Sequence, residues 1–205
     1  MRFAPADEEI EAGVTLRRSL ATVPHDSEEV LRRLDEFGAF DPVLLAVTFE
    51  EIGYAGITVP IVEREFRDDP ERAALAAAAQ LVGLGQRMLD MSVEYVKQRH
   101  QFGVPIGSFQ AVKHQLADAL KEVRFARPAV WRALSTLERR DVSMAKAMAS
   151  DAASFVARRA LQCHGAIGYT VEYDLHRFMK LTWVLARAHG DAAWHRDRIA
   201  KELEL

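Results

Sequence analysis

The chain has 205 residues, of which 49% are hydrophobic and 28% are charged, and its formal net charge is −3. This length and composition fit a globular protein of one domain, or one domain with a small appendage. The charge balance argues against nucleic-acid binding, because no basic face would dominate. We expect a cytoplasmic protein without a leader or membrane span, since the single cysteine suits a reducing compartment and no apolar run reaches ~18 residues.

Start signals in the first part of the chain predict short helices. Asp26 and Glu29 have the spacing of a capping box, which predicts a helix that runs to about Phe37. A capping aspartate before a proline, at residues 41–42, predicts a second helix over 43–53. Both helices are too short to form a core by themselves, so they indicate an appendage to a larger body.

The helical pattern stops over residues 54–68. Within this stretch, residues 58–62 (Thr-Val-Pro-Ile-Val) are typical of an extended linker. We therefore predict a short helical N-terminal appendage and linker over 1–68, followed by a main body over 69–205.

Two long helices are predicted at the start of the body. An Asp-Pro pair at residues 69–70 begins the first, which continues to Arg99 and would be ~45 Å long, a length suited to a helical bundle. Ser108 is predicted to cap the second, whose apolar residues keep helical spacing to Leu137. Pro128 is expected to kink this helix without ending it.

Three further helices complete the predicted body. The first spans residues 143–163 and is ended by Gly165 and Gly168, and two shorter ones follow at 174–188 and 191–205. No strand alternation is found. The predicted fold is all-α, an antiparallel four-helix bundle with a short helical appendage at its N-terminus.

Two motifs that suit a nucleotide ligand lie about 60 residues apart, each at the end of a long helix. They are residues 99–103 (Arg-His-Gln-Phe-Gly) and 162–169 (Gln-Cys-His-Gly-Ala-Ile-Gly-Tyr). Arg99 offers a planar set of donors that suits the phosphates of a dinucleotide, and Phe102 offers an aromatic face beside it. Gln162 can supply both a donor and an acceptor.

Each of these residues also has a purely structural interpretation. Arg99 could be a cation favoured by the helix dipole, and Phe102 and Phe109 could be core aromatics. Gly165 could leave room for a ligand to approach the backbone, or it could end a helix together with Gly168. The joint occurrence of the residues favours the functional interpretation.

The two motifs, with Ile-x-x-Phe-Gln at 106–110 between them, resemble the C-terminal helical domain of acyl-CoA dehydrogenases over residues 72–201. This resemblance implies FAD as cofactor. In the family, the matching side chains reach across a subunit interface to the pyrophosphate and adenosine parts of FAD. The resemblance assigns these contacts to Arg99, Phe102, Gln162 and Gly165, with Ala166 in place of the usual second glycine, where it is expected to crowd the site.

Other parts of such an enzyme are missing. The segment before the bundle is too short for the N-terminal helical domain and the middle β domain that the family carries. The resemblance places the glutamate base of the family at His189 or, in another branch, at Ala73. Glu71 would face elsewhere, because two residues turn a helix by about 200°. Asp191 and Ala193 replace residues that hold the subunit's own FAD.

The resemblance therefore implies a subunit of a heteromeric, FAD-dependent acyl-CoA dehydrogenase, which catalyses α,β-desaturation of an acyl-CoA. A full-length acyl-CoA dehydrogenase subunit would be its partner and would supply the base. Heteromeric members of the family act on bulky esters, including steroid fragments, so we expect steroid catabolism and a heterotetramer. One alternative is a flavin-free structural or regulatory partner of such an enzyme.

Another alternative is a homo-oligomeric enzyme in which His189 acts as general base, rather than being a surface or interface histidine. The other histidines and Cys163 lack metal-ligand spacing, so no metal is expected. Apolar residues on several faces of the second long helix, such as Phe125, Val130 and Trp131, predict a self-associated or partner-bound form that buries about 2,000 Å².

Overall fold

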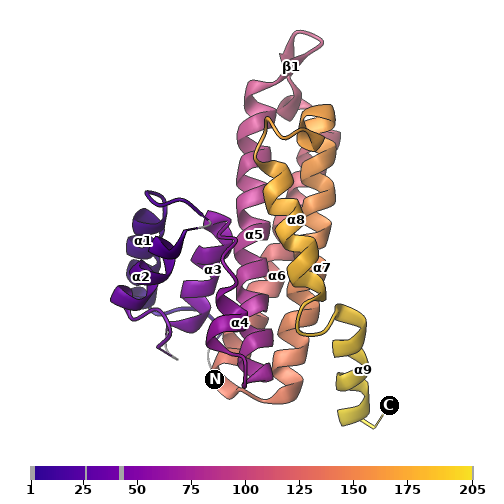
Figure 1. The fold of residues 1–205 in the computed structure, drawn as a ribbon. Coiled ribbons are helices and arrows are strands. Elements are labelled where there is room, and N and C mark those ends of the chain that lie inside the picture. The colour runs from indigo at the N-terminus through magenta and orange to yellow at the C-terminus, as the bar shows by residue number, and fades with distance from the viewer. Residues whose placement is uncertain (1–2, 26, 42–43, 205) are drawn as a thin grey trace.

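The computed structural model describes residues 3–25, 27–41 and 44–204. Three long helices lie side by side (Figure 1): α5 (Pro70–Gln98), α6 (Gln110–Thr136) and α7 (Arg139–His164). Helix α8 (Leu175–Arg187) completes the bundle by packing on α5 and α7, and α9 (Ala192–Glu202) packs on α7. The all-α bundle expected from the sequence is confirmed.

The start of α5 follows the sequence prediction. The Asp69 carboxylate accepts a hydrogen bond of 3.0 Å from the backbone N of Arg72, and Pro70 lies in the first turn. Most residues from Ala73 to Leu89 are buried, many of them alanines, so neighbouring helices approach closely. Because α5 packs on α3, α6, α7 and α8, it is the central helix of the fold.

Several predicted helix ends are wrong in detail. Helix α6 does continue through Pro128, but its N-cap residue is Phe109, not Ser108. The Ser108 hydroxyl donates instead to Pro105 O at 2.7 Å, because residues 106–108 form a tight 3₁₀ turn. Helix α7 begins at Arg139, earlier than expected, and a small antiparallel hairpin that the sequence did not indicate joins β1 (His100–Gln101) to β2 (Val104–Pro105).

The N-terminal region contains α1 (Asp7–Leu20), α2 (Glu28–Phe37), α3 (Leu45–Ala55) and α4 (Ile61–Glu65), which lie to one side of the bundle (Figure 1). Residues 58–60 lie outside any helix, but the prediction of an extended linker is wrong for Ile61 and Val62, with which α4 begins and which are buried in the core. Residues 26 and 42–43, on which two of the predicted start signals rest, lie outside the described residues.

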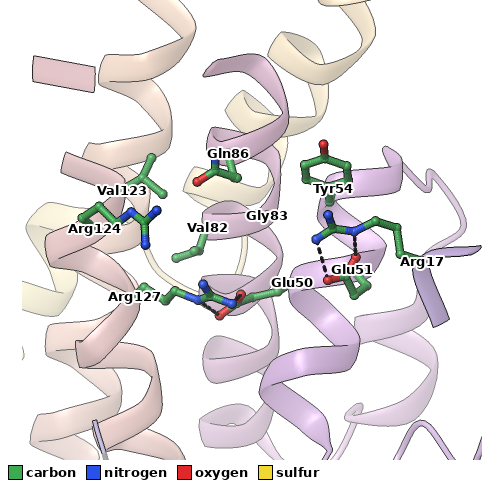
Figure 2. Close-up of a pocket in the computed structure, with 10 residues that line it drawn as sticks. All are labelled: Arg17, Glu50, Glu51, Tyr54, Val82, Gly83, Gln86, Val123, Arg124 and Arg127. Atoms are coloured by element: carbon green, nitrogen blue, oxygen red, sulfur yellow. Dashed lines mark hydrogen bonds and ion pairs between the residues drawn. The ribbon is translucent and has the colours of Figure 1, made fainter. Parts of the chain in front are cut away.

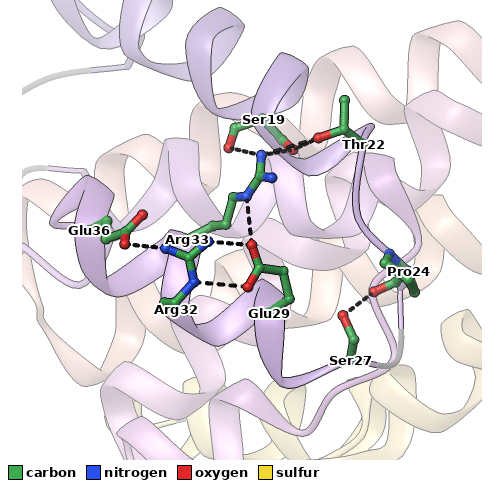
Figure 3. A network of polar contacts seen from close by, with 8 residues as sticks. All are labelled: Ser19, Thr22, Pro24, Ser27, Glu29, Arg32, Arg33 and Glu36. Atoms are coloured by element: carbon green, nitrogen blue, oxygen red, sulfur yellow. Dashed lines mark hydrogen bonds and ion pairs between the residues drawn. The ribbon is translucent and has the colours of Figure 1, made fainter.

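Glu29 takes part in a network of polar contacts that joins α2 to the end of α1 (Figure 3). Its carboxylate accepts hydrogen bonds from Arg32 and, at 3.2 Å, from Arg33. Arg33 also donates to Ser19 O at 3.0 Å and to the Thr22 hydroxyl at 3.1 Å. Because Arg33 bridges both helices, this network fixes the turn between them.

Helix α3 lies directly against α5. A Cβ atom at Gly83 would be 1.9 Å from Glu50 O, and one at Gly53 would be 2.0 Å from Gln80 O, so only glycine fits at these two positions. The two backbones touch, and a single hydrophobic cluster contains residues from both sides of the predicted boundary at 68/69. The division into 1–68 and 69–205 stays a prediction.

The predicted apolar surface of the second long helix is only partly present. Phe125 is 67% exposed, but Val130 and Trp131 are buried in the core between the helices. These residues lie on different faces of α6, as the helical period predicts. The faces that point inward are covered by α5 and α7.

Candidate functional site

The structure brings the two sequence motifs to the same end of the bundle (Figure 1). Helix α5 ends immediately before Arg99, and α7 ends at His164, two residues after Gln162. Tyr95, in the last turn of α5, stacks on the His164 ring with centroids 4.5 Å apart. The hairpin of β1 and β2 projects from this end. The sequence prediction that the motifs form one site is consistent with this placement.

Arg99 is the C-cap residue of α5 and leads into the hairpin. Its backbone N donates to Tyr95 O at 2.9 Å, and its carbonyl accepts from Ile106 N at 2.8 Å, so its backbone is held at both ends. The side chain is exposed. Among the described residues, no carboxylate or other acceptor binds its guanidinium group, which is therefore available to an external anion.

Phe102 lies at the tip of the hairpin. Its φ is 54°, that of the following Gly103 is 81°, and its side chain is 92% exposed. The ring contacts Phe109 edge-to-face with centroids 6.2 Å apart, and Phe109 is itself 38% exposed. The alternative that Phe102 is a core aromatic is wrong. So exposed an aromatic ring in a left-handed backbone conformation suits a residue that contacts another molecule.

Gln162 lies in the last turn of α7 with an exposed side chain that has no hydrogen-bond partner in the described part of the chain. Gly165 ends the helix with φ 63° and ψ −139°, and a Cβ atom there would meet nothing within 4 Å. The helix-ending role of Gly165 is thus confirmed, and the space beside it is open. Ala166 is exposed, and its expected crowding of the site stays a prediction.

The buried side of this end is uncharged. His164 is 3% exposed and its Nδ1 hydrogen-bonds to Ala160 O at 2.7 Å. Burial lowers the pKa of His164, so its ring is neutral at pH 7. Cys163 is buried as well, and burial raises the pKa of its thiol, so it is the inert helix-end thiol expected from the sequence.

The exposed side chains at this end fit part of FAD, the cofactor implied by the resemblance. A guanidinium and a carboxamide, both unused, suit the pyrophosphate and a neighbouring polar group of a dinucleotide. The open backbone at Gly165 permits close approach. The resemblance assigns the pyrophosphate and adenosine parts of FAD, and not the flavin ring, to Arg99, Phe102, Gln162 and Gly165.

His189 lies away from these residues, beyond the other end of α8, a separation of roughly 20 Å along that helix. Its φ is 57°, and its Nε2 is 3.7 Å from a carboxylate oxygen of Glu63 in α4. Its carbonyl oxygen is 3.0 Å from His195 Nε2. Burial lowers the pKa of His189, which keeps the ring neutral at pH 7.

The two positions at which the resemblance places the family's base, His189 and Ala73, lie near one pocket. His189 lines it together with Pro70 and Ala74, the neighbours of the buried Ala73. Glu71 is not available as a substitute, because its carboxylate is bound by Arg198 at 2.6 and 2.9 Å. Among the described residues that line this pocket none is a carboxylate, and Glu63 approaches His189 from outside the lining.

Lys146 is a notable residue that the sequence did not indicate. Its side chain is fully buried in α7, and its Nζ donates to Ser150 Oγ at 3.2 Å, Ala186 O at 3.3 Å and Gly190 O at 3.0 Å. Burial lowers its pKa to about 8. A lone lysine within the alanine-rich face of 145–157 was the available signal. Its contacts hold the turn that carries His189.

A second group missed from the sequence lines a pocket of about 60 Å³ between α1, α3, α5 and α6 (Figure 2). Glu50 accepts from Arg127 at 2.7 Å, and Glu51 accepts from Arg17 at 2.6 and 2.8 Å. Burial raises the pKa of Glu50. Two adjacent glutamates in an otherwise apolar helix were the available signal, and their arginines tie α1 and α6 to α3.

No helix in the described ranges is long and apolar enough to cross a membrane. Histidine, cysteine, aspartate and glutamate side chains in the same ranges form no group of three that could hold a metal ion.

Comparison with known proteins agrees with this architecture. The family model described as "Acyl-CoA dehydrogenase, C-terminal domain" matches residues 69–204. The acyl-CoA dehydrogenase IpdE2 of Mycolicibacterium smegmatis is 43% identical over 122 residues, which are 60% of this chain and 37% of that protein. The probable acyl-CoA dehydrogenase YngJ of Bacillus subtilis is 36% identical over 140 residues, 66% of this chain and 36% of that protein. The chain thus spans little more than a third of these relatives.

Solved structures extend the likeness to the whole chain. A chain of the ChsE4-ChsE5 complex from Mycobacterium tuberculosis matches 100% of this chain and 99% of its own length, with a TM-score of 0.83 at 17% identity. A glutaryl-coenzyme A dehydrogenase structure matches 77% of this chain and 37% of that one, with a TM-score of 0.64 at 30% identity. The first likeness concerns the fold alone. From the family match over residues 69–204, the chain belongs to the acyl-CoA dehydrogenase family and carries its C-terminal helical domain.

Proposed function

We propose that this chain is a subunit of a heteromeric, FAD-dependent acyl-CoA dehydrogenase and lends side chains to FAD that is held chiefly by a partner subunit. The partner would be a full-length acyl-CoA dehydrogenase and would supply the base. The observation that carries the proposal is the end of the bundle at which Arg99, Phe102 and Gln162 are exposed. Within the described residues the Arg99 and Gln162 side chains have no hydrogen-bond partner, and the Phe102 ring stays 92% exposed although it contacts Phe109.

Each side chain would have a distinct part in binding. Arg99 would pair with the pyrophosphate, for which its backbone is already fixed at the end of α5. Phe102 would cover the ligand from the hairpin, and Gln162 would hydrogen-bond to it beside the open backbone of Gly165. The flavin, when bound, would supply a hydride acceptor for the β-carbon of the acyl-CoA, and the partner's base would take the α-proton.

Two further observations support a partner. The described residues that line the pocket beside His189 include no carboxylate, which favours a base supplied by a partner. The fold also matches, over nearly full length on both sides, a chain of a complex named for two components. Another full-length match is to a steroid acyl-CoA dehydrogenase, Tcur3481-Tcur3483. We therefore propose a bulky, steroid-derived acyl-CoA as substrate, a heterotetramer as assembly and the cytoplasm as location.

A flavin-free structural or regulatory subunit is the second candidate. This candidate is favoured because no carboxylate is found among the described residues that line the pocket beside His189. It is also favoured because only Arg99, Phe102, Gln162 and Gly165 are proposed to contact a cofactor. An enzyme based on His189 is the third, since the ring is neutral and borders a pocket. It ranks last because the described residues that line the pocket include no serine, threonine or cysteine to act as a nucleophile beside the histidine.

The experiment is to purify the chain alone and together with a full-length acyl-CoA dehydrogenase subunit encoded beside it, and to measure bound flavin by absorbance. We expect a colourless chain alone and a yellow complex that reduces an electron acceptor with an acyl-CoA. A flavin-free complex would favour the structural candidate. A yellow, dehydrogenating preparation of the chain alone would refute the proposal.

A further inference from the structure

A pocket of about 370 Å³ lies where the N-terminal helices meet the bundle. This volume falls in the range of small-molecule sites. Its walls come from α1, the end of α3, the middle of α5 and the start of α8, and its lining residues include Arg17, Ala21, Ala55, Arg87, Arg177 and Phe178. Arg87 lies about 18 Å before Arg99 along α5, so this pocket is separate from the site proposed for FAD.

Arg87 differs from Arg17 and Arg177, the two other arginines that line this pocket. It is half-buried, and no carboxylate among the described residues forms an ion pair with it. The carboxylate of Asp90, one helical turn away, is already occupied on both oxygens. The Tyr54 hydroxyl donates to one of them at 3.0 Å, and Gln86 Nε2 donates to the other at 2.8 Å. A half-buried guanidinium left in this state favours binding of an anion.

The other charges that face the pocket are balanced. Figure 2 shows Arg17 held beside the Tyr54 ring by Glu51, with the guanidinium carbon 4.0 Å from the ring centroid and hydrogen bonds of 2.6 and 2.8 Å to the carboxylate. Arg177 is 3.4 Å from its neighbour Asp174 in the first turn of α8. Arg17 and Arg177 thus each have a carboxylate partner, whereas none of the described carboxylates forms an ion pair with Arg87.

The aromatic and aliphatic lining surrounds this cation. The Arg87 guanidinium carbon is 5.4 Å from the centroid of Tyr54 and 6.0 Å from that of Phe178. Ala21 and Ala55 add small apolar side chains. The first turn of α8 also lines the pocket, and the positive end of a helix dipole favours an anion there.

We propose that this pocket binds an amphipathic organic anion. Its carboxylate or phosphate head group pairs with Arg87, and Arg177 supplies a second donor when the loose contact to Asp174 opens. Its apolar body lies against Ala21, Ala55 and Phe178. The site joins the N-terminal helices to the bundle, so an occupant holds these two parts of the molecule together.

The test measures binding of 4-phenylbutyrate to the full chain by calorimetry. This probe has a carboxylate and an apolar body, whereas its amide has the same body without the charge, and inorganic phosphate has only a charged head. We expect the acid to bind about tenfold or more tightly than the amide, since a hydrogen bond to a charged group accounts for such a factor. We also expect phosphate to compete weakly.

Variants locate the site. Arg87→Gln is expected to weaken binding of 4-phenylbutyrate by about tenfold or more, and Arg177→Gln by a smaller factor. Arg18→Gln is the matched control, because Arg18 is exposed on α1 and borders no pocket described above. Thermal melting checks that each variant is folded. If Arg87→Gln does not fold, the affinity of Arg177→Gln, a substitution at the surface, decides the test. Equal binding of acid and amide, no binding at millimolar concentration, or unchanged affinity in both pocket variants would overturn the proposal.

Discussion

Tyr95 of α5 stacks on His164 of α7, with ring centroids 4.5 Å apart and ring planes at 28°. Tyr173 packs against both rings, at 6.1 Å from Tyr95 and 4.9 Å from His164. This aromatic cluster joins the last turns of the two helices from which Arg99 and Gln162 project. It therefore sets the relative position of two exposed side chains that share no direct contact in the chain.

Replacing Tyr95 tests this positioning. Tyr95→Leu is expected to lower the free energy of unfolding by about 1 kcal/mol, the size of an aromatic pair contribution, and to weaken flavin retention by the proposed complex. Urea denaturation measures the first effect and flavin release the second. Tyr169→Leu is the control, because Tyr169 is 73% exposed. If the two variants behave alike, the cluster has no positioning role.

The contact between α3 and α5 predicts that Gly83 tolerates no side chain. A Cβ atom there would be 1.9 Å from Glu50 O, a backbone atom that can move only with α3 as a whole. Gly83→Ala is expected to destabilise the protein by about 3 kcal/mol. Gly85→Ala, where the nearest atom is a Val123 methyl at 3.2 Å, is expected to change stability by less than about 1 kcal/mol. Chemical denaturation compares them, and equal effects would contradict the close contact.

The sequence predicted the long helices because their start signals and apolar periods are local. The sequence predictions were wrong where a side chain had a different contact in the folded protein from the one that its local pattern indicated. Ser108 resembled a cap, but its hydroxyl binds Pro105 O within a 3₁₀ turn. Residues 58–62 resembled a linker, but Ile61 and Val62 find a buried surface and form a helix.

For the candidate site, the sequence predicted which residues belong together but not their surroundings. Arg99 and Gln162 were assigned to one site through the resemblance of their two motifs to those of the family. The burial of Lys146 depends on where α8 and the following turn pack, which no local pattern indicates. The same holds for Arg87, whose neighbours in the pocket come from three other helices, α1, α3 and α8.

Lys146 makes stability depend on pH above neutrality. Its pKa is lowered from 10.5 to about 8 in the folded chain, mainly by burial. Between pH 8 and 10.5 the unfolded chain holds this proton and the folded chain does not, so stability rises with pH in this window. Lys146→Met is expected to lose that rise. Denaturation of both proteins at pH 8 and pH 10 provides the measurement, and parallel changes would contradict a lowered pKa.

His195 predicts the behaviour in acid. Its ring is fully buried, and burial lowers its pKa from 6.5 to about 4. As pH falls from 6.5 to 4, this histidine binds a proton in the unfolded chain but not in the folded chain. The free energy of unfolding therefore decreases in this window. His195→Gln keeps a donor for His189 O and is expected to show a smaller decrease. Melting temperatures at pH 7 and pH 5 would reveal the difference, and an unchanged acid profile would rule it out.

The central claim, that this chain completes a flavin site of its partner, is tested most directly by the FAD dissociation constant of the co-purified complex. Arg99→Ala is compared with wild type and with Arg18→Ala, which removes an equally exposed arginine far from the motifs. Because Arg99→Ala loses a charge-assisted contact to the pyrophosphate, we expect it to bind FAD about tenfold more weakly than wild type. We expect Arg18→Ala to bind FAD as tightly as wild type. Equal FAD affinity in all three complexes would contradict the claim.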